Sequence, residues 1–259
     1  MTQLFYNLQH TNLTMSTKDN HITENGKDPM GRAIADYHNT RKASKLRVLS
    51  SMFYEDEIPV ATLFRTFKDL PIQEQKAIEL CRGRILDVGA GSGCHCTELM
   101  ARGHEVMGID ISELSVEVMK SRGIDARNVN FFDETFTGKF DTILLLMNGI
   151  GIVGKIDRME KFFSSAKRLL APGGQILLDS SDIKYIFMDD DGSILIDLAA
   201  GYYGEVDFTM KYKNITGEKF DWLYIDFDTL TMYAEQYGFT CEKCIDGKHD
   251  DYLARLTIA

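Results

Sequence analysis

Three glycines at alternate positions follow a short apolar run and precede a helical pattern in Arg84-Ile-Leu-Asp-Val-Gly-Ala-Gly-Ser-Gly93. Glycines at such a turn let the backbone approach a ligand, and the free amides at the start of the helix can face its negative groups. A dinucleotide site has its third glycine three residues after the second, but that position is Cys94. A phosphate-binding P-loop would need Gly-Lys-Ser/Thr next, and this is absent. The spacing therefore predicts a ligand-binding loop that is neither an NAD or FAD site nor a P-loop.

An acidic residue follows the loop at a distance that suits recognition of a ribose. The next predicted strand, Glu105-Val-Met-Gly-Ile-Asp110, ends in a carboxylate about 20 residues beyond the glycines. A carboxylate there can accept hydrogen bonds from both ribose hydroxyls, so Asp110 is the predicted ribose ligand. The alternative is purely structural: a tight strand-to-helix turn, followed by an aspartate that caps the next helix.

These residues resemble the first two motifs of the class I S-adenosylmethionine-dependent methyltransferases. Asp87 stands at the acidic position of the first motif and Asp110 at that of the second. The resemblance continues through Phe140-Asp141, which opens the fourth strand, and Leu170-Ala-Pro-Gly-Gly174 before the fifth. It covers roughly residues 84 to 180. It implies a Rossmann-like fold, S-adenosylmethionine as the cofactor and methyl transfer as the reaction.

The resemblance also implies which residues hold the cofactor. The glycine loop would bind the methionine end, and the residues after the second and third strands would contact the adenine. The expected residues are Gly89, Ala90, Gly91 and Gly93 at the methionine end, Asp87 near its amino group, Ile111 on the adenine, Phe132 or Asp133 at its other edge, and Asn148 where cofactor and substrate meet. For Phe132, Asp133 and Asn148 a structural role is the alternative.

Candidates for a catalytic base follow from the direction of the methyl group. Methyl transfer is an in-line displacement in which positioning alone can supply about 7 to 11 kcal/mol, so a base is optional. A base is expected past strands four and five or in the N-terminal cap. Asp182 is the leading candidate, Tyr185 lies in the same stretch, and His38 is a second possibility in the cap. A helix cap at residues 180–182 and a surface histidine are the alternatives.

Two further groups of residues contain side chains that can bind metal ions. The run Asp189-Asp-Asp191 has ligands suited to Mg²⁺ or to a cationic substrate, but a solvated turn is favoured. Cys94-His-Cys96 and Cys241-Glu-Lys-Cys244 suggest zinc, yet the first trio opens a helix and the second pair faces opposite sides of a strand. We therefore expect no metal and, with five cysteines, free thiols rather than disulfides.

The elements that must position these residues alternate regularly after Gly83. The pattern predicts an α/β fold with a doubly wound, seven-stranded, mostly parallel sheet that ends in an antiparallel C-terminal hairpin. Strands are expected at 84–88, 105–109, 127–132, 142–147, 175–178, 239–245 and 252–258. Helices are expected at 94–101, 113–121, 157–170 and 228–237.

The rest of the chain divides into three parts. Residues 1–28 are polar and aperiodic, which predicts a disordered or loosely docked tail. Residues 29–82 predict a helical N-terminal cap, with helices from Pro29 and around 60–68 and 72–81. Within the methyltransferase domain at 83–259, the stretch 181–227 is a substrate-side insertion with a β-hairpin at 205–212 and 220–227. Specificity is expected to reside in the cap and the insertion.

The composition of the chain disfavours some classes of substrate and binding partner. The 259 residues include 29 basic and 39 acidic side chains, a net charge of -10 that makes nucleic acid a poor substrate. The longest apolar run, residues 143–147, is far shorter than the roughly 20 residues that cross a bilayer. We expect a cytoplasmic monomer or homodimer that methylates a small molecule. An aminopropyltransferase and a non-catalytic S-adenosylmethionine-binding regulator or assembly subunit are the alternatives.

Overall fold

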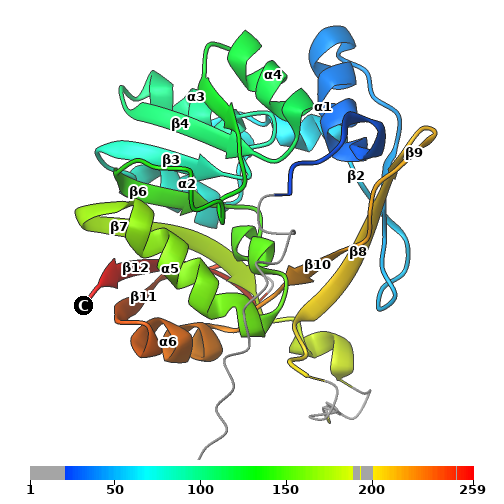
Figure 1. Ribbon diagram of the computed structural model, residues 1–259. Helices are drawn as coiled ribbons and strands as arrows, with labels where there is room; N and C mark the ends of the chain where they lie inside the picture. Colours follow the sequence, from blue (N-terminus) through cyan, green and yellow to red (C-terminus); the bar gives the residue numbers. More distant parts are fainter. Residues whose placement is uncertain (1–20, 189–192, 194–200, 249) are drawn as a thin grey trace, which may run out of the picture.

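A seven-stranded sheet forms the centre of the computed structural model, which describes residues 21–188, 193, 201–248 and 250–259 (Figure 1). The strand order is β11-β12-β7-β6-β3-β4-β5; β12 runs antiparallel to both neighbours, and the other pairs are parallel. The strands are β3 (Arg84–Val88), β4 (Glu105–Asp110), β5 (Asp125–Asn128), β6 (Phe140–Leu145), β7 (Leu170–Ser181), β11 (Phe239–Asp246) and β12 (Asp251–Ile258). The predicted fold class is confirmed.

Helices cover both faces of this sheet. One face carries α2 (Ile72–Leu80), α3 (Cys94–Ala101) and α4 (Glu113–Ser121), and the other carries α5 (Met159–Leu169) and α6 (Phe227–Gln236). Successive strand residues point to opposite faces, so Ile85 and Leu144 pack on the first group of helices while Leu86 and Ile143 pack on the second. Strands buried on both sides need continuous apolar runs, which explains the residues found in β3 and β6.

A smaller antiparallel sheet stands beside the main one (Figure 1). Its strands follow the order β10-β8-β1-β2, and β9 pairs with β8. They are β1 (Leu46–Leu49), β2 (Asp56–Ile58), β8 (Glu205–Tyr212), β9 (Ile215–Thr216) and β10 (Phe220–Leu223). The predicted hairpin is present as β8 and β10, and β1 and β2 extend it from the N-terminal part of the chain. These two strands were not predicted.

The N-terminal cap contains less helix than predicted. It holds α1 (Pro29–Thr40), then β1 and β2, and then two short 3-10 helices, η2 (Val60–Phe64) and η3 (Phe67–Asp69), in place of the helix expected at 60–68. Ile34 of α1 packs with Leu46, Val118 and Tyr212 in a separate hydrophobic cluster. The cap therefore joins α4 of the main domain to the smaller sheet. The other 3-10 helices are η1 (Asn25–Lys27), η4 (Gly149–Val153), η5 (Ile156–Arg158) and η6 (Lys184–Phe187).

The described part of the predicted tail docks on the main domain. The backbone N of Thr23 donates to Ile111 O at 3.0 Å, and the side chain of Asn130 donates to His21 O at 3.3 Å. Asp28 caps α1 and accepts a hydrogen bond from Ser112 Oγ. Residues 21–28 therefore lie against the residues that follow β4, whereas residues 1–20 are outside the described residues.

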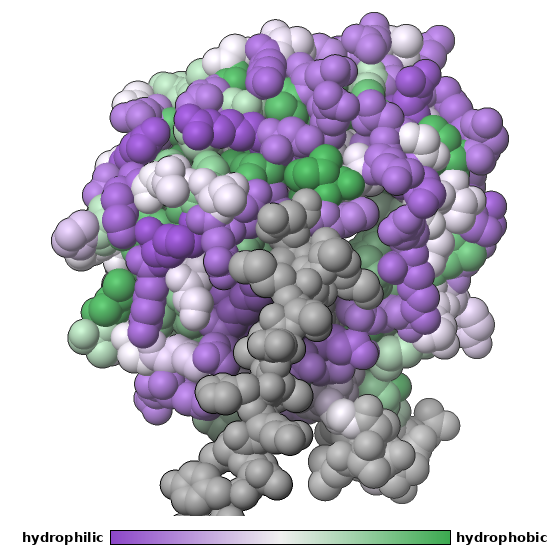
Figure 2. All heavy atoms as spheres, viewed as in Figure 1, coloured by the Kyte–Doolittle hydropathy of each residue, from purple (hydrophilic) through white to green (hydrophobic). Residues whose placement is uncertain are grey.

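The described surface is mainly hydrophilic on the face seen in Figure 2, where hydrophobic residues occur in small groups between polar ones. Apolar side chains are instead concentrated in the interior. In the part of the chain that the structure describes, no helix has both the length and the apolar character needed to cross a membrane. All five cysteines are free thiols.

Candidate functional site

The order of the main sheet reverses at two neighbouring strands, β3 and β6. From β3 the chain proceeds to β4 and β5 on one side, and it then returns to place β6 on the other side of β3. In open α/β sheets, ligands bind at such a switch point, outside the carboxyl ends of the strands. The glycine loop, residues 89–93, follows β3, and a second loop, Met147 to Gly149, follows β6. We name the space between these loops the switch-point crevice.

The glycine loop adopts a conformation that its three glycines permit, because φ is 68°, 55° and 76° at their positions. The backbone N atoms of Gly89 and Ala90 donate to Ile109 O at 2.9 and 3.1 Å, which fastens the loop to β4. A Cβ added at Gly89 would meet no atom within 4 Å, whereas one added at Gly93 would lie 2.4 Å from Ile124 Cδ1. Gly89 thus opens onto free space, and Gly93 allows close packing at the end of α4.

Asp110 lies at the rim of the crevice and is fixed by two backbone amides. Its Oδ2 atom accepts from Gly91 N at 2.8 Å, and its Oδ1 atom accepts from Ser112 N at 2.9 Å. Burial raises the pKa of Asp110 to about 6, although both amides oppose that shift, and the nearby Asp28 adds to it. Each carboxylate oxygen keeps a further lone pair that can accept a hydroxyl proton. This geometry fits the predicted ribose ligand.

The cap covers the glycine loop from outside. Ile34 Cδ1 of α1 would lie 3.7 Å from a Cβ placed at Gly91, so this part of the loop is in van der Waals contact with the cap. Ser92 Oγ donates to Leu63 O of η2, and Arg122 Nη1 donates to Ser92 O. The N-terminal cap and α4 therefore both hold the loop in place.

Asp87 is buried beneath the glycine loop, at the end of β3, and is 2% exposed. Its carboxylate accepts a hydrogen bond from Cys96 Sγ at 3.1 Å, and burial raises its pKa. The side chain contacts the first turn of α3 from within the domain. Its expected place near the amino group of the cofactor stays a prediction.

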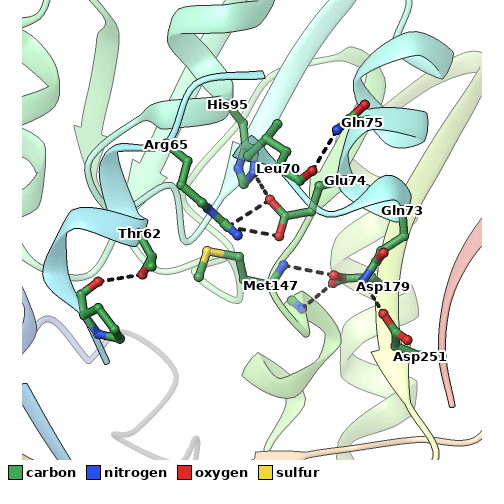
Figure 3. Close-up of polar contacts among 12 residues, drawn as sticks. Thr62, Arg65, Leu70, Gln73, Glu74, Gln75, His95, Met147, Asp179 and Asp251 are labelled. Atoms are coloured by element: carbon green, nitrogen blue, oxygen red, sulfur yellow. Dashed lines mark hydrogen bonds and ion pairs between the residues drawn. The ribbon is translucent and has the colours of Figure 1, made fainter. Parts of the chain in front are cut away.

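A charged cluster joins the cap to the first turn of α3 (Figure 3). Glu74 of α2, whose side chain is 4% exposed, accepts from Arg65 Nη2 through both oxygens at 3.0 Å and lies 2.7 Å from His95 Nε2. Burial lowers the pKa of His95, but Cys94 and the carboxylates of Glu74 and Asp87 raise it well above the usual value. His95 and Arg65 thus share one carboxylate beside the glycine loop.

The second loop of the crevice is held in a rare backbone conformation. Met147 and Asn148 have φ values of 65° and 56°, in the left-handed region that residues other than glycine rarely adopt. The carboxylate of Asp179, on β7, accepts from Met147 N and Gly149 N, each at 3.1 Å (Figure 3). Burial raises the pKa of Asp179 to about 7, although both amides oppose the shift. Asn148, predicted at the cofactor–substrate border, is therefore placed beside the crevice.

The residues predicted to contact adenine differ in how open they are. Ile111 is 38% exposed, as an adenine platform would need to be. Phe132 is 4% exposed in the core, and the guanidinium of Arg158 lies 5.0 Å from its ring centre. The Asp133 carboxylate accepts from the N and Oγ1 atoms of Thr135 at 2.8 and 2.7 Å. The side chains of Phe132 and Asp133 are thus occupied in structural contacts.

The leading base candidate, Asp182, is engaged by two partners. Its Oδ2 atom lies 2.8 Å from Lys184 Nζ, and its Oδ1 atom accepts from Tyr203 Oη at 2.8 Å. Tyr185, on η6, is 54% exposed. Both oxygens of the Asp182 carboxylate are thus occupied by partners, and its role as a base stays a prediction.

His38 is not brought to the crevice. Its Nε2 atom lies 3.0 Å from Ser121 Oγ, and its ring stacks near Phe64. Ser121 is the last residue of α4, and the helix begins beside Ser112. At 1.5 Å per residue, this helix separates His38 from the carboxyl edge by about 13 Å. A catalytic role for His38 would need a large movement of the cap.

Metal ligands form no cluster in the described ranges: no group of three or more His, Cys, Asp or Glu side chains there is arranged to hold an ion. The run Asp189-Asp-Asp191 lies outside the described residues.

The sequence analysis gave no role to Arg65, Glu74 or Asp179, and it named His95 only within the Cys94-His-Cys96 group. A signal for Asp179 was available, because Ile176-Leu-Leu-Asp179 repeats the pattern of Ile85-Leu-Asp87, an apolar run that ends in an aspartate at the carboxyl edge. The contact between Arg65 and Glu74 depends on how η2 and α2 fold together, and no motif announces it.

Known proteins resemble this chain over its whole described fold. A family model described as a methyltransferase domain matches residues 85–174. An S-adenosylmethionine-dependent methyltransferase from Bacteroides fragilis, solved in complex with S-adenosyl-L-homocysteine, is 56% identical, with a TM-score of 0.89 over 94% of this chain and 100% of its own. YqeM of Bacillus subtilis is 26% identical over 63% of this chain and 73% of its own length. A ubiquinone biosynthesis O-methyltransferase of Dechloromonas aromatica is 30% identical over 40% of this chain, which spans about half (47%) of that relative.

Proposed function

This chain belongs to the class I S-adenosylmethionine-dependent methyltransferases, and from that premise we propose that it methylates an oxygen or nitrogen atom of a small soluble molecule in the switch-point crevice. The observation that carries the proposal is the covering of the glycine loop by the cap, through Ile34 and Leu63. A covered loop favours an acceptor small enough to enter the crevice over a macromolecular surface.

The residues at the crevice fit the cofactor of this family. The open space at Gly89 is where backbone can approach a ligand, and Asp110 has acceptor capacity for two hydroxyls. We infer that Asp110 binds the ribose, the backbone of Gly89 and Gly91 borders the methionine end, and Ile111 packs on the adenine. Held by these residues, the cofactor would supply an electrophilic methyl group to a lone pair of the acceptor, leaving S-adenosylhomocysteine, and the acceptor would release its proton to water.

The chain contributes alignment and exclusion of water rather than a dedicated base. Leu63 and Ile34 are nearly or fully buried over the loop, and Asn148 and Gly149 form the opposite wall. Holding donor and acceptor in line accounts for a large part of the rate of such a displacement. In this proposal the Asp182 carboxylate, paired with Lys184, orders the start of the insertion.

The net charge of the protein and its known relatives further support a small molecule as the methyl acceptor. A protein with a net charge of -10 repels a polyanionic substrate. The relative from Dechloromonas aromatica is named for O-methylation in ubiquinone biosynthesis. Membership of the methyltransferases disfavours an aminopropyltransferase and a non-catalytic subunit. A cytoplasmic location and a monomeric or homodimeric state stay predictions.

The experiment is a transfer assay with methyl-labelled S-adenosylmethionine. Purified protein would be incubated with a cell extract separated into a fraction below 1 kDa in size and a macromolecular fraction, a cut-off on the order of the largest ligand such a crevice encloses. We expect wild type, but not Asp110→Ala, to transfer label to a small-molecule product that is separated by chromatography from the labelled S-adenosylmethionine. Label found in protein or nucleic acid alone would overturn the small-molecule assignment while leaving the family intact.

A further inference from the structure

The loop after β6 carries the most unusual backbone in the described part of the chain. Among all the described residues, five non-glycine residues have positive φ. Of these five, Met147 and Asn148 are the two that are consecutive in the sequence. Each such residue costs on the order of 1–3 kcal/mol and persists where its surroundings over-determine it. Such strain is found at binding and catalytic sites, so what holds this loop is a functional question.

Asp179 is the main support of the loop. Its carboxylate receives the amides on both sides of Asn148, from Met147 and Gly149, at 3.1 Å each. The residue is 6% exposed and lies within β7, where it stands opposite Leu253 of β12. Because β7 is paired with β12 at Asp179 and with β6 up to the preceding residue, Leu178, the carboxylate is a fixed anchor rather than a mobile surface group.

Asn148 ties the same loop to the substrate-side insertion. Its Nδ2 atom donates to Leu223 O of β10 at 3.1 Å, and its Oδ1 atom accepts from Ser180 Oγ at 3.1 Å. Ser180 Oγ in turn accepts from Ile225 N at 3.0 Å. The loop is therefore fastened both to the main sheet and to the strand that leads out of the smaller sheet.

The position of the loop gives these anchors their importance. It follows β6, the neighbour of β3 at the switch point, so it faces the glycine loop across the crevice. The Met147 side chain is 40% exposed, and in Figure 3 it lies between the Arg65–Glu74 pair and Asp179. A methyl acceptor bound in the crevice would therefore contact the loop Met147 to Gly149.

We propose that Asp179 is a positioning residue for methyl transfer, because its bonds to the amides of Met147 and Gly149 hold Met147 and Asn148 in the left-handed conformation on the acceptor side of the crevice. This inference rests on the proposed function. Asp179 acts through the loop and not on the reacting atoms. Loss of its carboxylate should therefore disturb alignment of the acceptor while leaving the cofactor's binding loop unchanged.

The first test measures the loop itself and needs no acceptor. Asp179→Asn keeps the shape of the side chain but presents an NH₂ group to one of the two amides. In the complex with S-adenosylhomocysteine, we expect hydrogen exchange at Met147 and Gly149 to become at least about tenfold faster, as the loss of a hydrogen bond to a charged group implies. Asp141→Asn is the matched control. The Oδ2 atom of Asp141 also accepts from a backbone amide, Arg84 N at 2.8 Å, but at the amino ends of the strands, away from the crevice.

The second test measures transfer to the small-molecule fraction that wild type labels. For Asp179→Asn we expect kcat to fall about tenfold or more, with the KM for S-adenosylmethionine within about twofold of wild type. Adding Met147→Gly to Asp179→Asn should restore part of the loss, because glycine adopts positive φ without strain. Met147→Gly alone reports the effect of losing the side chain.

The outcomes separate this inference from the proposed function. If wild type labels no small molecule, the proposed function fails, and the exchange experiment still decides whether Asp179 holds the loop. Unchanged exchange in Asp179→Asn overturns the inference. So does faster exchange without a fall in kcat relative to Asp141→Asn, or a fall that appears wholly as a higher KM for the cofactor.

Discussion

The carboxylate of Asp110 and the backbone amide of Gly91 are joined by a hydrogen bond of 2.8 Å, which links the end of β4 to the loop that follows β3. The carboxylate predicted to bind the ribose thus also shapes the glycine loop. Two neighbouring parallel strands are needed to bring these groups together, because Gly91 and Asp110 are 19 residues apart in the chain.

Asp110→Ala should weaken binding of S-adenosylhomocysteine by about 10- to 100-fold, since each hydrogen bond to a charged group contributes about 1.5–3 kcal/mol. Calorimetric titration measures this change directly, with NAD as a ligand that wild type should not bind. Affinity unchanged from wild type would remove Asp110 from the cofactor site.

The affinity for S-adenosylhomocysteine should also depend on pH. Hydroxyl groups donate to the ionised carboxylate, and the pKa of Asp110 is about 6 because of burial. Affinity should therefore be full above pH 7 and fall about tenfold by pH 5, as protonation competes with the ligand. In Asp110→Asn the affinity should be flat over this range. A wild-type profile that is equally flat would contradict the assignment.

Gly89→Ala and Gly93→Ala should have different consequences. Both residues have positive φ, which costs an alanine about 1–2 kcal/mol. At Gly93 the new methyl group also meets Ile124 at 2.4 Å, so a further 1–3 kcal/mol or so of stability should be lost. At Gly89 the methyl group enters the open crevice, and affinity for S-adenosylhomocysteine should suffer more than stability. Urea unfolding and calorimetry of the two variants distinguish these effects, and equal losses of stability would contradict the packing argument.

Glu74→Gln should lower the free energy of unfolding by about 3–5 kcal/mol, because it leaves Arg65 and His95 buried without their counterion. Since the folded pKa of His95 is raised, its contribution is present below pH 6.5 and is lost as pH rises through the folded pKa. Glu79→Gln on the same helix is the control, because Glu79 is half exposed and lies 3.9 Å from Lys76. Similar urea midpoints for the two variants would show that the cluster contributes little.

Asp182→Asn should reduce methyl transfer by less than about tenfold, well below the 10²- to 10⁴-fold that removal of a general base costs. The reason is its pairing with Lys184 and Tyr203. Steady-state rates with the labelled small-molecule fraction measure the effect. A hundredfold loss that Asp182→Glu restores would reinstate Asp182 as the base.

The elements predicted best from the sequence are those whose pattern is local. The strand Arg84–Val88 and the helices Cys94–Ala101 and Glu113–Ser121 have the predicted bounds, because an apolar run, glycines and an N-cap serine mark them. β1 carries no comparable signal, since it lies between β2 and the remote strand β8: Ser44 N, just before β1, donates to Tyr212 Oη, 168 residues away in the chain. Such pairing depends on tertiary structure and not on local periodicity.

The candidate site also contains residues that the sequence indicates and residues that it does not. Asp110 and the glycine loop were singled out because each directly follows or ends an apolar strand, and the two strands are consecutive in the chain. The Arg65–Glu74–His95 cluster unites a 3-10 helix, α2 and α3, so no spacing within one element indicates it. The sequence also does not reveal that Lys184 turns back towards the carboxylate of Asp182, whose role as a base stays a prediction.

The pairing of β1 with β8 sets an order for assembly on the ribosome. Leu46 and Tyr212, paired and fully buried, cannot meet until the chain has been synthesised beyond β8. The glycine loop and its parallel strands can form earlier, whereas the cap that covers them must wait for its strand partner. Non-local pairings of this kind form slowly. A nascent chain would therefore display its crevice uncovered, and closure of the cap would be among the last steps of folding.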